Sequence, residues 1–282
     1  MTESAPGPKT PNAARGTVRR VWLVTGAVLA AAALVIGVTG IVAALQRTST
    51  ETRYASQTYP RSAAHVQVDV DRGKVTIAGG DAGRVETQHA RRWSGGEPSV
   101  DETWSGDTLR VDGRCPDSLL SWIGQVCSVE YAAQVPRDAG ADVGSTTGSI
   151  EVGQLGGQLG LSATTGSITV EDVSGPLTAR ATTGDITGSG LRSDRVDAEV
   201  STGDVTLRFA EPPERLTAAA RTGDVTIEVP RSGGPYRVDA RTNTGEQQVD
   251  VAQDPDAAPE RTIDVTTSTG DIHVRYADRG DR

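Results

Sequence analysis

The sequence has few aromatic side chains: they make up 4% of its 282 residues, and Phe and Met each occur once. This composition excludes a wide globular interior filled with bulky side chains. Hydrophobic residues still reach 36%, so the chain can bury a core. Because Thr, Val, Ala and Gly are abundant, the composition favours a thin core between stacked β-strands.

Lysine is nearly absent, with Lys9 and Lys74 beside 26 arginines, and the formal net charge is −9. A chain of this charge lacks the electrostatic attraction on which general nucleic-acid binding depends. We therefore expect no nucleic-acid partner.

Motifs of catalytic or cofactor chemistry are missing as well. The three histidines, His65, His89 and His273, are far apart in the chain, and none lies in a zinc-protease or triad-like setting. No Walker loop or dinucleotide fingerprint occurs. The sequence thus predicts a protein that is not an enzyme and that uses no cofactor or metal ion.

A repeat fills the second half of the chain. Seven Thr-Gly pairs recur at successive steps of 18, 18, 19, 20, 22 and 25 residues. A near-constant period of this length indicates one structural unit stacked on copies of itself. The glycines of these pairs are Gly148, Gly166, Gly184, Gly203, Gly223, Gly245 and Gly270.

Apolar residues keep register with these glycines. Positions seven, five and three before each glycine are apolar or small, and in five of the seven repeats apolar residues follow two and four positions after it, as at Val205 and Leu207. This pattern describes a strand, a corner, a second strand and a return. The predicted fold class is therefore all-β, a repeat β-solenoid with two short strands in each rung of 18–25 residues. Independent hairpins in a sandwich would not repeat one corner seven times. Gln247 breaks the apolar pattern, so we expect the sixth rung to be loosened or to lie at an edge.

Acidic residues follow several of the corner glycines, namely Asp185, Asp204, Asp224 and Asp271. If the corners stack at the strand spacing of about 4.8 Å, these carboxylates form a column. Paired carboxylates can cleave glycosidic bonds, whereas an Asp at a turn usually bonds its own backbone. We expect the turn role.

An apolar segment near the N-terminus predicts a membrane anchor. Residues 21–45 are uncharged and mostly apolar, which is long enough for a helix to cross a bilayer. Residues 1–20 carry four basic residues against one acidic residue, which places the N-terminus in the cytoplasm and the rest outside. The alternative is a cleaved signal peptide, but its apolar region normally spans only about 7–15 residues. We expect an uncleaved, single-pass anchor in a bacterial cell membrane.

The expected organisation follows from these segments. It comprises a disordered cytoplasmic tail at 1–20, a transmembrane helix at 21–45, a polar stalk at 46–60, N-terminal solenoid or capping strands at 61–136, and the repeat solenoid at 137–282.

Cys115 and Cys127 are the only cysteines. Outside the membrane an oxidising compartment makes a disulfide the default, and two cysteines without nearby histidines make a poor zinc site. We therefore expect a structural disulfide. The apolar residues 119–123 between them are expected to cover the first rung or, alternatively, to contact a membrane or a partner.

The corner motif, as in Ala181-Thr-Thr-Gly-Asp-Ile186 and Val200-Ser-Thr-Gly-Asp-Val205, resembles the LiaG-like "putative adhesin" family of unknown function. The resemblance covers residues 61–276. It implies a β-solenoid ectodomain of bacterial envelope proteins, some of them linked to envelope stress and the response to antimicrobial peptides. It carries over no catalytic residue. The single anchor and the cysteine pair are similar to an actinobacterial version.

The sequence predicts a membrane-anchored, extracytoplasmic β-solenoid that acts as a non-catalytic, adhesin-like or envelope-stress-associated surface module. Its expected partners are the membrane itself and a cell-envelope component or membrane protein. The alternative is a cell-wall polysaccharide-active β-helix enzyme that uses the acidic corner residues. A third hypothesis is a signalling accessory that contacts its partner through the cytoplasmic tail.

Overall fold

The computed structural model describes residues 34–35, 50–81, 83–116, 126–254 and 261–277. The chain divides into two units, Met1–Ser49 and Thr50–Arg282. In the first unit only Leu34 and Val35 are described, and both are helical. The rest of the expected membrane helix, the tail at 1–20 and the segment 119–123 lie outside the described residues. Within the described part of the chain, no helix has the length and hydropathy that a membrane crossing requires.

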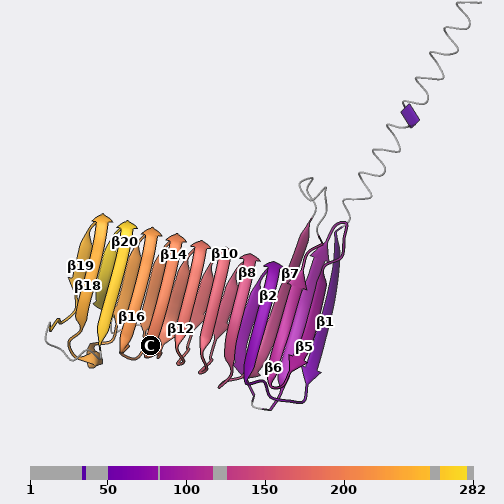
Figure 1. Cartoon of the computed structure of the whole chain (residues 1–282), viewed down its shortest axis with the longest axis horizontal. Helices are drawn as coiled ribbons and strands as arrows, with labels where there is room; N and C mark the ends of the chain where they lie inside the picture. The colour runs from indigo at the N-terminus through magenta and orange to yellow at the C-terminus, as the bar shows by residue number, and fades with distance from the viewer. Residues whose placement is uncertain (1–33, 36–49, 82, 117–125, 255–260, 278–282) are drawn as a thin grey trace, which may run out of the picture. The chain divides into compact units, whose positions relative to one another are not determined.

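The second unit consists of two long β-sheets (Figure 1). Sheet A contains β1 (Glu51–Tyr59), β3 (Val75–Gly80), β4 (Val85–Trp93), β7 (Cys127–Pro136), β9 (Ile150–Gly153), β11 (Ile168–Glu171), β13 (Ile186–Leu191), β15 (Val205–Phe209), β17 (Val225–Val229), β19 (Gln247–Asp250) and β21 (Ile272–Tyr276). Sheet B contains β2 (His65–Arg72), β5 (Ser99–Ser105), β6 (Thr108–Arg114), β8 (Gly140–Thr147), β10 (Leu159–Thr165), β12 (Leu177–Thr183), β14 (Arg195–Thr202), β16 (Arg215–Thr222), β18 (Arg237–Thr244) and β20 (Thr262–Thr269). A short 3-10 helix spans Arg231–Gly233.

Each repeat forms one rung: a strand of sheet B, the Thr-Gly corner, and a strand of sheet A. Neighbouring rungs pair in parallel with their corners in register, so that Thr165 lies beside Thr147 and Thr183. This arrangement confirms the predicted β-solenoid.

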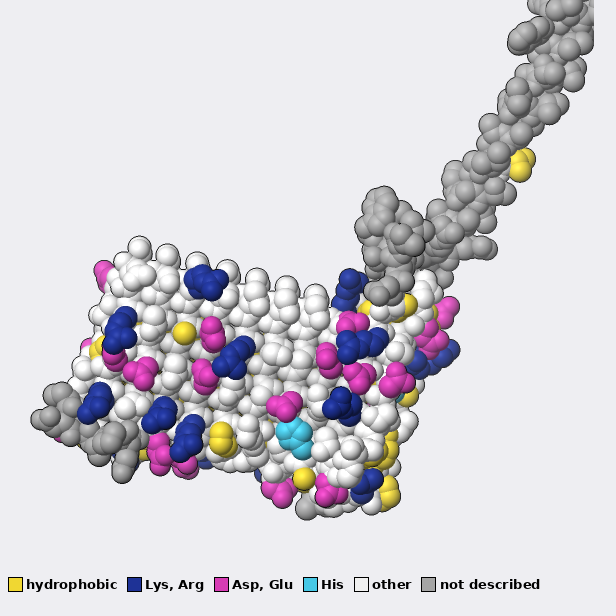
Figure 2. All heavy atoms as spheres, in the orientation of Figure 1, with side chains coloured by type: hydrophobic (Ala, Val, Ile, Leu, Met, Phe, Trp, Pro, Cys, Tyr) yellow, Lys and Arg dark blue, Asp and Glu magenta, His cyan; other side chains and the backbone are white. Residues whose placement is uncertain are grey.

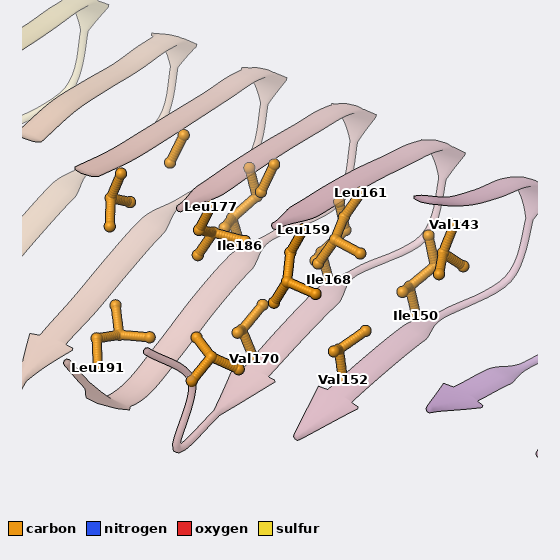
Figure 3. Packing of buried hydrophobic residues seen from close by; sticks show 14 of the residues in the cluster. Val143, Ile150, Val152, Leu159, Leu161, Ile168, Val170, Leu177, Ile186 and Leu191 are labelled. Atoms are coloured by element: carbon orange, nitrogen blue, oxygen red, sulfur yellow. The ribbon is translucent and has the colours of Figure 1, made fainter. Parts of the chain in front are cut away.

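The core is the thin layer between the two sheets (Figure 3). The inward positions expected from the alternation are buried except in the sixth rung, where Val238, Ala240 and Val249 are half-buried. Val200 and Val205, on either side of one corner, are 2% and 0% exposed. A third buried column, which comes after the second inward position of the sheet A strands, was not expected from the sequence. It is formed by Leu155, Val173, Leu191 and Phe209.

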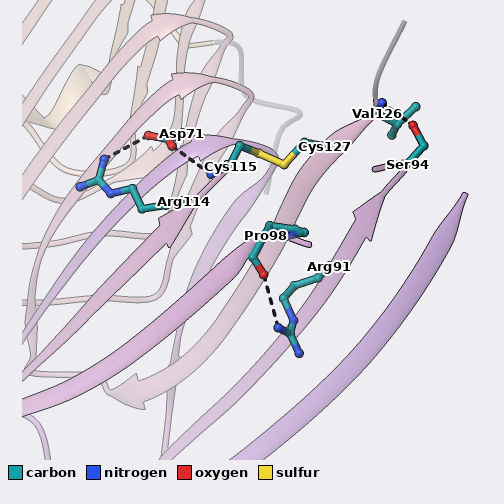
Figure 4. The surroundings of a disulfide bond; sticks show 8 residues. All are labelled: Asp71, Arg91, Ser94, Pro98, Arg114, Cys115, Val126 and Cys127. Atoms are coloured by element: carbon teal, nitrogen blue, oxygen red, sulfur yellow. Dashed lines mark hydrogen bonds and ion pairs between the residues drawn. A yellow bond between two sulfur atoms is a disulfide. The ribbon is translucent and has the colours of Figure 1, made fainter. Parts of the chain in front are cut away.

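The N-terminal region continues the stack. Within the N-terminal solenoid or capping strands expected at 61–136, β2 and β3 form a complete early rung, whose corner Gly73 has a φ of 135°. Strands β6 and β7 form one rung more, because β6 pairs with β2 and β7 pairs with β3. In place of a Thr-Gly corner, this rung has the segment between Cys115 and Cys127, and the predicted disulfide closes it (Figure 4). Asp71 accepts hydrogen bonds from the Cys115 N–H and from Arg114, both at 3.0 Å.

The expected stalk at 46–60 is partly wrong. Residues 51–59 form strand β1, which pairs antiparallel with β4 along its whole length. No apolar alternation marks this segment, because β1 is an edge strand whose side chains are mostly exposed. Its last residue, Tyr59, packs edge-to-face on Trp104, with ring centroids 5.2 Å apart. Strands β4 and β5 are likewise antiparallel to their neighbours, so this end differs from the parallel repeats.

The rungs leave chain order at the C-terminal end (Figure 1). The last rung, β20 and β21, lies between the fifth rung and the sixth, and β18 and β19 therefore form the end of the stack. The sixth rung was expected to be edge-like, and its edge position is confirmed. Gln247 serves this position: its amide, oriented to satisfy both of its groups, donates to the Ala240 C=O (3.1 Å) and accepts from the Thr242 N–H (3.0 Å). The Gln247 side chain thus satisfies the hydrogen bonding of a backbone C=O and a backbone N–H of the terminal strand β18.

Candidate functional site

The corner glycines form a continuous column that requires glycine. All seven have φ between 132° and 144°, a region that L side chains rarely adopt. Each also lies directly against the next corner. A Cβ at Gly203 would sit 2.4 Å from the Gly184 carbonyl oxygen, and one at Gly270 would sit 2.1 Å from that of Gly223. The column is therefore architectural.

The corner acids hold neighbouring rungs together. A carboxylate oxygen of Asp185 accepts the backbone N–H of Asp204 (3.0 Å), and Asp204 in turn accepts that of Asp224 (2.8 Å). Asp224 accepts the N–H of Asp271, and Asp271 accepts that of Glu246, each at 2.8 Å. We expected each Asp to bond its own turn, and that detail is wrong because the corners lie close enough for the carboxylate to reach the next one. The four acids are brought together as a column of backbone acceptors.

The other candidate groups are not brought together. Among the described residues, no three His, Cys, Asp or Glu side chains are placed to hold a metal ion. His65 pairs with Asp142 in sheet B (3.0 Å). His273 lies on β21, at the far end of the stack from His89 on β4.

A polar cluster that the sequence did not reveal lies between the sheets at the N-terminal end. Glu102 on β5 reaches across from sheet B to three strands of sheet A. It accepts from Tyr59 of β1 (2.5 Å), Thr87 of β4 (3.3 Å) and Tyr131 of β7 (3.0 Å). Glu102 therefore fixes these three strands relative to one another.

The electrostatics of this cluster do not favour nucleophilic chemistry. Burial, together with Glu102, raises the pKa of Tyr59 to about 12, and the same causes raise the pKa of Tyr131 further. Burial lowers the pKa of His89, against the opposing charge of Glu102. Both phenols thus remain protonated donors at neutral pH.

A hollow of about 650 Å³ lies on the outer face of sheet A, over the strands that Glu102 fixes. Two cross-strand rows line it: Ser56, Gln88, Ala132 and Thr76, and beside them Tyr54, Ala90, Glu130 and Lys74. One of the two inner positions of each row is an alanine, Ala132 or Ala90, whose short side chain leaves room for the hollow. A second hollow of about 370 Å³ shares Thr76 and continues over β9 and β11. The two hollows lie next to each other over six neighbouring strands, from β1 to β11, and together we call them the sheet A groove.

Sheet B carries a smaller depression. Two hollows of about 350 and 300 Å³ share Asp69, Gly144, Ser162 and Arg180. Their floor is low because Gly144 and Gly160 replace larger outward residues, and no aromatic side chain lines them. On the face seen in Figure 2, acidic and basic side chains are interspersed and hydrophobic ones are scattered singly.

Comparisons with known proteins concern the repeat region and the fold. Residues 139–275, just under half of the chain, match the family described as Toastrack DUF4097. No curated protein matches the sequence.

Three crystal structures are similar to the chain. They are described as a "putative cell adhesion protein" from Clostridium sporogenes, a "putative adhesin" from Bacteroides fragilis and a "Putative lipid binding protein" from Parabacteroides distasonis. Their identities to this chain are 10%, 10% and 9%, and their TM-scores are 0.36, 0.48 and 0.36. The alignments cover 80%, 80% and 82% of this chain, and 100%, 97% and 98% of those chains. Scores of this size carry no argument about function. The family match contains all seven Thr-Gly corners, and residues 139–275 of this β-solenoid thus match the Toastrack DUF4097 family.

Proposed function

We propose that this chain is a non-catalytic binding module displayed outside a bacterial cell membrane by an N-terminal transmembrane helix. The observation that carries the proposal is the use of the corner acids. Asp185, Asp204, Asp224 and Asp271 each accept a backbone N–H of the next corner. A carboxylate held in this way supports the stack, whereas glycosidase chemistry requires a carboxylate directed at a bound sugar.

The sheet A groove supports the binding part of the proposal. It is larger than the depression described on sheet B, and the Glu102 cluster fixes the strands that form part of its floor. A preformed hollow of several hundred Å³ with a few polar groups is typical of binding sites. The alternative is a polysaccharide-cleaving enzyme acting through the corner acids, but none of the four hollows described above is lined by Asp185, Asp204, Asp224 or Asp271.

The anchored topology rests on the sequence alone. A membrane-impermeant thiol reagent applied to intact cells should label the variant Thr52→Cys and should not label Ser4→Cys. Labelling of Ser4→Cys alone would show that the orientation is the opposite one, with the N-terminus outside the cell. The envelope-stress association, the LiaG-like relationship and the actinobacterial origin stay predictions of the same kind.

The binding function is tested with the full chain in nanodiscs and cell-envelope material of the source organism. The protein should be retained on this material and should release no reducing sugar ends from it. Failure to be retained would overturn the proposal. Release of reducing ends that is lost in Asp204→Asn would establish the enzyme instead.

A further inference from the structure

We propose that the sheet A groove binds an uncharged, β-linked polysaccharide, with Tyr54 as the stacking platform. This inference rests on the proposed binding function and names its ligand class. It starts from Tyr54, which is 78% exposed on the outer face of β1 in a chain with only 4% aromatic residues. An exposed aromatic ring at the wall of a hollow offers the flat apolar face on which the C–H face of a pyranose ring packs.

The length of the groove favours a polymer. Its lining comes from six neighbouring strands, β1, β4, β7, β3, β9 and β11. At a strand spacing of about 4.8 Å, six strands span about 24 Å. The groove lies on a sheet face, so a chain longer than this can run across it and continue over the strands beyond β11.

The polar groups suit hydroxyl recognition. Ser56, Gln88, Thr76 and Thr169 line the groove and offer donors as well as acceptors. Inward of the free edge of β1, the backbone groups beneath the groove are paired between strands of the sheet. A ligand lying across these strands is therefore recognised through side chains, as sugar hydroxyls are.

The charge of the groove excludes a polyanion. Lys74 lies in the lining of the groove, and its charge is paired with Glu151 of the neighbouring strand at 2.6 Å. Glu130 and Glu171 add negative charge to the lining. Because the whole chain carries a formal charge of −9, a strongly anionic polymer would be repelled.

The test uses the full chain in nanodiscs and titrates it with the hexamer of β-1,4-linked N-acetylglucosamine. Saturable binding is expected. Tyr54→Ala should weaken it at least tenfold, whereas Tyr54→Phe, which keeps the ring, should stay within about threefold of the wild type, since the ring supplies the stacking. Ala132→Arg fills the floor of the groove and should abolish binding, while Thr206→Arg, outside the groove on the same sheet face, should not change it.

Absence of saturable binding by the wild type would overturn the inference, as would unchanged binding in both Tyr54→Ala and Ala132→Arg. Thermal melting of each variant establishes that it is folded. If the protein is retained on envelope material but does not bind the hexamer, the binding function stands and the polysaccharide assignment fails. Stronger binding of heparin, used as a polyanionic probe, would contradict the charge argument.

Discussion

Asp271 donates its backbone N–H to the carboxylate of Asp224, which lies 47 residues earlier in the chain, at 2.8 Å. The intervening corner at Gly245 is displaced to the end of the stack, where it follows Gly270. The last rung of the chain is thus inserted between the fifth and the sixth.

Side-chain charges favour this order. Glu228, whose side chain is 11% exposed, lies between Arg208 (3.0 Å) and Arg275 (2.5 Å) on the adjacent strands. Asp250 follows next to Arg275, so the column alternates in sign. Stacking in chain order would place Asp250 beside Glu228 and would enclose Gln247 between Val225 and Ile272.

Paired cysteines test the inserted rung. Thr226 lies opposite His273, at a strand spacing of about 4.8 Å that a disulfide can bridge. The double variant Thr226→Cys/His273→Cys should therefore form a second disulfide, detected by peptide mass analysis. The matched pair Thr226→Cys/Gln248→Cys, two strands apart, should not. Crosslinking of the second pair alone would mean that the rungs stack in chain order.

The regular part of this fold could be predicted from sequence because corner and core repeat with one period. The positions of Val205, Leu216 and the corner glycines follow directly from it. The period cannot give the order of the rungs, since similar rungs offer similar neighbours. The order of the rungs is indicated instead by the polar Gln247 and by the charges of Glu228 and Asp250.

The candidate site could not be predicted in the same way. The sheet A groove joins β1 to strands that come later in the chain, and its depth depends on two alanines, Ala90 and Ala132. Strand β1 itself has no apolar alternation. The Glu102 cluster likewise depends on a contact across the core, which local patterns do not encode.

The corner column predicts a strong contrast between two glycines. Gly203→Ala should destabilise the chain by more than about 2 kcal/mol, because the methyl group meets the Gly184 carbonyl and φ is unfavourable. Gly153→Ala should be within about 0.5 kcal/mol of neutral, since its Cβ would make an ordinary contact at 3.5 Å. Urea unfolding of the full chain in detergent measures both. Equal effects would mean that the corner does not require glycine.

The inside and outside of a rung predict a second contrast. Val205→Asp places a charge in the core, where the side chain is 0% exposed, and should be severely destabilising. Thr206→Asp, on the outer face between Thr187 and Thr226, should stay within about 0.5 kcal/mol of the wild type. Similar melting temperatures of the two variants would refute the register.

The Glu102 cluster predicts a loss of stability at alkaline pH. The pKa of Tyr59 is raised from 10.0 to about 12 in the folded chain, so between these values the folded state retains a proton that the unfolded state loses. Its contribution to stability is therefore complete below pH 10 and declines as the pH rises towards 12. Urea unfolding between pH 9 and pH 11 should show a shallower decline for Tyr59→Phe than for the wild type. Parallel declines would show that Tyr59 does not titrate as the cluster requires.

We propose that the corner acids hold the stack and do no chemistry. Asp204 tests this proposal most directly, because its carboxylate accepts the Asp224 N–H at 2.8 Å. Asp204→Ala should lower the free energy of unfolding by about 1–2 kcal/mol. Asp204→Asn, which keeps an acceptor oxygen, should lose less, and Asp264→Ala, an exposed acid away from the corners, should be nearly neutral. If Asp204→Ala and Asp204→Asn are both as stable as the wild type, or if Asp204→Asn abolishes a cell-wall cleaving activity of the wild type, the account is contradicted.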